Sequence, residues 1–160
     1  MDGALFALTL VTALGCGLSA GALFAFSSFV MKALARLPAV QGIAAMQSIN
    51  VMAVTPAFMT ALFGTAVACV ALAVWALADW DASFGPYLLA GSGLYLAGTI
   101  GLTMAYHVPR NDALATVEPT SPEAATHWTR YVAEWTRLNH VRVASGLAAA
   151  AAFTIALNAG

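Results

Sequence analysis

Long apolar segments with very few charges constrain this chain more than any other feature of its sequence. They cover residues 4–31, 56–78, 86–107 and 139–158, and a helix of about 20 residues is enough to cross the roughly 30 Å hydrocarbon core of a bilayer. Charged residues make up 8% of the chain, whereas soluble domains carry about 25%. Lipid must therefore be the main solvent. We predict an all-α fold, an integral membrane four-helix bundle that forms a single domain over residues 1–160.

Two segments modify this simple picture. Residues 40–54 predict a short interfacial helix after the first span, because Gln47 and Asn50 share one of its faces. The last helix is predicted to start near residue 123 and to project into the cytoplasm before it enters the membrane. Between them, Val108-Pro109 is predicted to end the third helix, because a residue before proline disfavours helical angles. Residues 107–112 would then form a polar elbow.

The distribution of charge predicts an orientation. Four spans place the first and third connections on one side of the membrane, and all six cations lie in or beside those connections: Lys32, Arg36, Arg110, Arg130, Arg137 and Arg142. The opposite side carries Asp2, Asp79 and Asp81, with Trp80 expected at headgroup depth. The positive-inside rule therefore predicts a protein of the inner or cytoplasmic membrane with both termini outside and the polar loops in the cytoplasm.

The net charge, the two cysteines and a GxxxG step indicate which contacts the chain is expected to make. The net charge of −1 gives no indication of a nucleic-acid partner. Cys16 and Cys69 lie in apolar runs and are interpreted as packing residues. Gly17 and Gly21 form a GxxxG step, which favours close helix packing. We interpret that step as packing inside the chain rather than as a dimer face, and a homo-oligomer stays possible.

The residues that could carry chemistry gather at the predicted cytoplasmic side. On the last helix, one face is formed by side chains that recur every three or four residues: Trp128, Tyr131, Trp135, Asn139 and Arg142. The elbow adds a histidine, a cation, an amide and a carboxylate: His107, Arg110, Asn111 and Asp112. These groups could form a structural network that satisfies only its own hydrogen bonds. Alternatively, His107 and His140 face a common pocket under the helix that carries Gln47 and Asn50.

Four segments are distinctive in combination: 25–38 (AFSSFVMKALARLP), 41–50 (QGIAAMQSIN), 107–115 (HVPRNDALA) and 128–142 (WTRYVAEWTRLNHVR). In these segments the chain resembles the anthrone oxygenase-like (DUF1772) family of small integral membrane proteins. The resemblance implies a four-helix membrane bundle. It also implies a possible oxidation of anthrones to anthraquinones, a reaction associated with some members and carried out without an obvious cofactor.

Such a reaction needs a base near neutral pH, donors for a developing oxyanion and a flat apolar slot, and the sequence offers all three. Our hypothesis takes His140 or His107 as the base. Arg142 or Arg110, with Asn139 or Asn111, would stabilise the oxyanion. A planar, hydrophobic aromatic substrate, anthrone- or quinol-like, would be bound by Trp128, Tyr131, Trp135, Gln47, Asn50 and Asp112. His127, near the charged face, is interpreted as a surface residue. No cofactor and no metal site are predicted.

Two other classes of function stay open. Two histidines at helix ends in a bundle could ligate haem, although the sequence lacks ligand spacings such as HxxxH or HExxH. The chain could also be a non-enzymatic membrane protein that binds lipid or quinone. Loss of turnover without loss of folding after alanine replacement of His107 and His140 would favour the enzyme.

Overall fold

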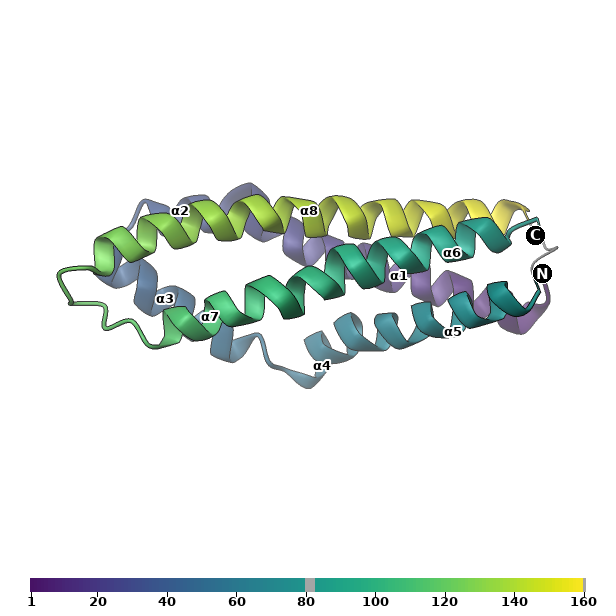
Figure 1. Ribbon diagram of the computed structural model, residues 1–160, viewed down its shortest axis with the longest axis horizontal. Coiled ribbons are helices and arrows are strands. Elements are labelled where there is room, and N and C mark those ends of the chain that lie inside the picture. The colour runs from purple at the N-terminus through teal and green to yellow at the C-terminus, as the bar shows by residue number, and fades with distance from the viewer. Residues whose placement is uncertain (80–82, 160) are drawn as a thin grey trace.

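The computed structural model describes residues 1–79 and 83–159, which form helices and no strand. Four long helices, Gly3–Ala35, Pro56–Ala78, Gly85–Ala115 and Ala124–Ala159, are apolar enough to cross a membrane. They lie side by side in one elongated bundle, with both chain termini at the same end (Figure 1). The predicted all-α membrane bundle of four spans is therefore confirmed.

Three of the spans are interrupted by π-helical turns. The first consists of α1 (Gly3–Ala25), η1 (Phe26–Val30) and α2 (Met31–Ala35), and the second of α4 (Pro56–Met59), η2 (Thr60–Gly64) and α5 (Thr65–Ala78). The third consists of α6 (Gly85–Gly93), η3 (Leu94–Gly101), η4 (Thr103–His107) and α7 (Val108–Ala115). The last is a single helix, α8 (Ala124–Ala159). π-Helical turns are rare and occur frequently at functional sites.

Polar caps mark where two spans begin. Leu5 N donates to the Asp2 side chain at 2.8 Å, and Phe58 N donates to Thr55 Oγ1 at 3.3 Å. Pro56 follows that cap at the first helical position. An N–H at this position makes no intrahelical hydrogen bond, so proline, which lacks the N–H, costs nothing there. The second span therefore starts at a fixed residue beside the interfacial helix.

The predicted interfacial helix is α3 (Ala39–Met52), which packs against α8 and α7 at the end of the bundle opposite the termini (Figure 1). Gly42 contacts the Trp128 indole so closely that a Cβ atom at Gly42 would collide with the ring. Gln47 Nε2 donates to the Leu114 and Val117 carbonyls at 2.9 and 3.0 Å. These contacts fix α3 across the start of α8.

The length of α8 takes the protein beyond the hydrocarbon core of a bilayer. Its 36 residues correspond to about 54 Å at 1.5 Å per residue, against roughly 30 Å of hydrocarbon. Its C-terminal half is rich in alanine, and Ala149, Ala152 and Ala156 are buried together with Phe153. Small side chains permit close helix contacts, so neighbouring helices hold this half in place.

The structure corrects two interpretations of the sequence. The third helix does not end at Val108-Pro109 but continues to Ala115. Proline removes one helical N–H and crowds the carbonyl four residues earlier, and the wide turn η4, directly before it, makes room for the ring. Gly17 and Gly21 are not packed inside the chain, because no atom would lie within 4 Å of a Cβ at either position. The predicted placements of Trp80 and Asp81 lie outside the described residues.

Candidate functional site

A cavity of about 200 Å³ lies where the three π-interrupted spans meet α3 and α8. We call it the Arg142 cavity. Its polar lining comes from five residues: Asn50, Thr103, His107, Asn111 and Arg142. Its apolar lining comes mainly from α1, η1, α3 and the start of the second span: Leu23, Phe26, Met46, Ile49, Ala53, Val54, Phe58, Met59, Leu62, Phe63, Val108 and Trp135.

The Arg142 side chain is buried at the polar side of this cavity, with 4% of its surface exposed. Its Nη2 donates to Asn139 Oδ1 at 2.6 Å, and its Nη1 donates to Thr103 Oγ1 at 3.1 Å. The guanidinium carbon lies 5.2 Å from the centre of the Trp135 ring. Asn139 is itself fully buried and donates to Leu23 O at 2.8 Å and Ser27 Oγ at 2.7 Å. Asn139 therefore ties the guanidinium to the first span.

Among the described residues, no carboxylate forms an ion pair with this buried cation. Across residues 1–79 and 83–159, the one ion pair joins Arg110 to Glu134 at 3.1 Å. The Arg142 Nε–H has no hydrogen-bond partner, and neither has the Asn50 amide nitrogen, which also belongs to a cavity-lining residue. Leaving a buried charge unpaired costs several kcal/mol, on the order of 3–5. Unused donors on a cation beside a cavity are the arrangement expected of a site for an anionic oxygen.

His107 is the histidine that lines the cavity, and only 1% of its surface is exposed. Its Nδ1 lies 3.2 Å from Leu102 O, and its Nε2 lies 3.2 Å from Trp135 O. A neutral imidazole donates through one nitrogen only, whereas an imidazolium donates through both. In the neutral ring, one nitrogen therefore donates to its carbonyl, and the other keeps a lone pair without a donor facing it.

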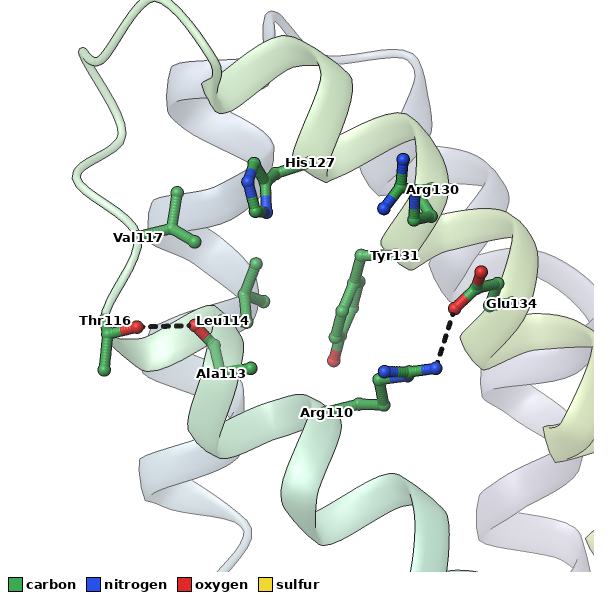
Figure 2. Close-up of a pocket in the computed structure, with 9 residues that line it drawn as sticks. All are labelled: Arg110, Ala113, Leu114, Thr116, Val117, His127, Arg130, Tyr131 and Glu134. Carbon is green, nitrogen blue, oxygen red and sulfur yellow. Dashed lines mark hydrogen bonds and ion pairs between the residues drawn. The ribbon is translucent and has the colours of Figure 1, made fainter.

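Asn111 closes the cavity on the side of α7 and α8. Its Oδ1 accepts from Tyr131 Oη at 2.8 Å and from Trp135 Nε1 at 3.0 Å. Beyond this wall lies a second, more polar cleft of about 300 Å³, in which Tyr131 stands between the helices and Arg110 pairs with Glu134 (Figure 2). Tyr131 thus separates that cleft from the Arg142 cavity.

The structure does not bring all the predicted site residues together. His140 is exposed and lies with Lys32 and Arg137 on another face of α8, so the expected common pocket for His107 and His140 does not form. The reason is helical periodicity, because position 140 lies about 100° around the helix from Asn139. The two histidines therefore do not form a ligand pair for haem.

Six further candidates do not line the Arg142 cavity: Gln47, Arg110, Asp112, Trp128, Tyr131 and Asn139. Arg110 and Asp112 are exposed, and Gln47 anchors α3 through its two carbonyl contacts. Trp128 is buried against Gly42 and stacks on Tyr131, with ring centres 5.8 Å apart. Asn50, Asn111, Trp135, His107 and Arg142 are the predicted site residues that line the cavity.

Sequence reasoning missed the contributions of the π-helical turns. Phe26 in η1, Leu62 and Phe63 in η2, and Thr103 in η4 all line the cavity. These residues lie inside apolar runs where nothing in the sequence distinguishes them from lipid-facing neighbours. In the described part of the chain, no group of three or more metal-ligating side chains was found.

A second, larger opening adjoins the cavity between α1 and the connection from α3 to α4. We call it the vestibule, and it has a volume of about 380 Å³. Its lining is almost wholly apolar: Ala22, Leu23, Phe26, Ile49, Met52, Ala53, Thr55 and Phe58. Five of these residues also line the Arg142 cavity, so the two spaces are contiguous.

Comparison with known proteins places the chain in a family. No curated protein and no solved structure matches it. The family model for anthrone oxygenase matches residues 52–152, a range that contains the second and third spans and most of α8. Because this match covers more than half of the sequence, the chain belongs to the anthrone oxygenase family.

Proposed function

We propose that this protein is a membrane-embedded oxygenase that oxidises a planar aromatic substrate of the anthrone or quinol type. The observation that carries the proposal is the buried Arg142, which has no carboxylate partner among the described residues and lies in a cavity with a mainly apolar lining. Family membership supports an oxygenase. The cavity adds a reason for the substrate class, because a cation with unused donors fits an aromatic molecule whose oxygen becomes negative during the reaction.

For an anthrone, the overall reaction replaces the two hydrogens of the acidic CH₂ by a carbonyl oxygen. One O₂ is consumed and one water is released. Loss of a proton from the CH₂ carbon gives an enolate, and its electron-rich carbon reacts with O₂ to form a C–O bond. After protonation, the resulting hydroperoxide loses water to give the ketone of the anthraquinone.

Arg142 would stabilise the enolate oxygen through its free Nε–H and remaining Nη hydrogens. Asn50 would contribute its unpartnered amide nitrogen. His107 would accept the proton from carbon through the ring nitrogen that carries no hydrogen in the neutral form, because it is the histidine that lines the cavity. Trp135 and Phe26, whose ring centres are 5.7 Å apart, would contact the planar rings.

The test is anthrone oxidation by the purified protein in lipid vesicles, followed by oxygen uptake and anthraquinone absorbance. Arg142→Met removes the charge but keeps an apolar side chain of similar length. We expect turnover to fall by about 10²–10³, the effect of losing an oxyanion donor. Stability should change little, because replacing a buried charge by an apolar side chain is often neutral.

Arg137→Met is the matched control, because Arg137 lies on the same helix but is exposed. It should retain full activity. Wild-type turnover no faster than protein-free vesicles would contradict the proposal. If the wild-type protein binds anthraquinone but consumes no oxygen, the non-enzymatic alternative, a quinone-binding membrane protein, would be favoured instead.

A further inference from the structure

The Arg142 cavity is too small to hold a polycyclic substrate alone. Ligand pockets commonly measure about 300–1,000 Å³, whereas this cavity measures about 200 Å³. The vestibule extends it by a contiguous space on one side. A substrate whose reacting oxygen contacts Arg142 must therefore place its remaining part in the vestibule.

The surroundings of the vestibule show what it opens to. Met52, which lines the vestibule, and Val54, which lines the adjoining cavity, are 67% and 70% exposed. Phe24 and Phe29 on the first span are exposed as well. Adjacent large apolar side chains that face outward on a membrane bundle contact lipid. The opening between α1 and α4 is therefore directed at the hydrocarbon of the bilayer and not at water.

Compared with the vestibule, the polar side of the Arg142 cavity is closed to water. Tyr131 and Trp135 both donate to Asn111, and the three side chains separate the Arg142 cavity from the polar cleft of Figure 2. A neutral aromatic molecule dissolved in the bilayer would meet the vestibule without crossing this wall.

Resting on the proposed function, we infer that the substrate is an amphiphile that enters sideways from the bilayer through the vestibule. The ring system that carries the acidic CH₂ reaches Arg142, while an apolar substituent stays between α1 and the α3–α4 connection. Ala22 and Ala53 determine specificity, because their small side chains lie on opposite walls and leave the vestibule open. Ala22 lines only the vestibule, whereas Ala53 also lines the Arg142 cavity.

The experiment compares anthrone with an anthrone that carries a long alkyl chain, using protein in phosphatidylethanolamine–phosphatidylglycerol vesicles. For the wild-type protein, the alkylated substrate should show the higher kcat/KM, with both substrates corrected to their concentration in the membrane. Ala22→Trp fills the vestibule without entering the lining of the Arg142 cavity. It should lower kcat/KM for the alkylated substrate about tenfold, mainly through KM, which corresponds to about 1.4 kcal/mol. Plain anthrone should be affected less.

Ala53→Trp fills the vestibule from the opposite wall and keeps the inference testable if Ala22→Trp fails to fold. Ala71→Trp, on the exposed face of α5 and away from both spaces, is the matched control and should behave as wild type. Folded Ala53→Trp or Ala22→Trp protein with wild-type kcat/KM for the alkylated substrate would overturn the inference. Equal wild-type kcat/KM for both substrates would do the same.

Binding separates this inference from the proposed function. Alkyl-anthraquinone affinity, measured by quenching of the intrinsic tryptophan fluorescence, does not depend on turnover. If wild-type protein fails to oxidise anthrones but Ala22→Trp still weakens that binding about tenfold, lateral entry stands and the oxygenase proposal fails. If oxidation occurs and vestibule variants leave both binding and kcat/KM unchanged, the oxygenase stands and lateral entry fails.

Discussion

At the scale of single residues, the pair Asn139 and Arg142 explains why a cation is tolerated beside lipid. The Asn139 side chain donates twice to the first span and accepts once from Arg142. It therefore fixes the guanidinium without neutralising it. A carboxylate in that position would neutralise Arg142 and leave no attraction for an anionic oxygen.

We predict that Asn139→Ala destabilises the protein, whereas Arg142→Met does not. The alanine removes three hydrogen bonds of a fully buried side chain, each worth about 0.5–1.5 kcal/mol, so the expected loss is about 2–4 kcal/mol. Chemical unfolding in mild detergent measures it. Asn158→Ala, at an exposed site near the end of α8, is the control and should change stability by less than about 0.5 kcal/mol.

The two histidines first considered as bases make separable predictions. His107→Phe preserves the edge contact with Trp135, whose ring centre lies 5.0 Å away, but removes the proton acceptor. We expect kcat to fall by about 10²–10⁴, the usual contribution of a general base. Binding of anthraquinone should persist, since Arg142 remains.

His140→Phe is the comparison for this prediction, because His140 is exposed outside the cavity. It should leave kcat unchanged. The opposite pattern, with activity lost in His140→Phe and kept in His107→Phe, would show that the assignment of the base is wrong.

At the scale of elements, α3 completes the cavity although it does not cross the membrane. It contributes Met46, Ile49 and Asn50 to the lining. Its position depends on the contact between Gly42 and Trp128. Trp128 therefore supports the site by holding α3, rather than by lining the cavity.

We predict that Gly42→Ala weakens substrate binding without touching the cavity. The new Cβ would collide with the Trp128 ring, so α3 must shift and carry Asn50 and Ile49 with it. The expected signs are a lower melting temperature and a raised KM. Gly93→Ala is the matched control, because its Cβ would meet open space. Glycine costs up to about 1 kcal/mol in a helix, so this variant should be neutral or slightly more stable.

The π-helical turns are the second feature at this scale. Turns η1, η2 and η4 each place a side chain in the Arg142 cavity. A π turn widens the helix and shifts the register of every following side chain. The three turns thus bring residues from three spans toward the Arg142 cavity. They occur within segments whose sequences are typical of ordinary membrane helices.

At the scale of the whole molecule, the charges divide the bundle into two ends. The termini lie together at one end, and α3 and the start of α8 lie at the other (Figure 1). Lys32, Arg36, Arg110 and Arg130 belong to this second end. The predicted orientation, with the cationic end in the cytoplasm, rests on the positive-inside rule.

We predict that fusions at the two termini report the same compartment, outside the cytoplasm. A C-terminal alkaline phosphatase fusion should be active, and a fluorescent protein that folds only in the cytoplasm should stay dark. Reciprocal results would mean that the bundle has the inverted orientation. A control fusion within the connection between Thr116 and Glu123 should give the opposite pattern.

The sequence by itself determined the solvent, the number of spans and the face of α8 that is buried. These properties follow from hydropathy and from the helical period, which are local, so Trp128, Tyr131, Trp135, Asn139 and Arg142 were correctly placed on one face. Only the tertiary structure decided which of these residues reach the cavity. It separated His107 from His140, left Arg142 without a carboxylate and carried the third helix past Pro109. Those outcomes depend on how helices distant in the sequence rotate and pack against one another, and on π turns that no local pattern marks.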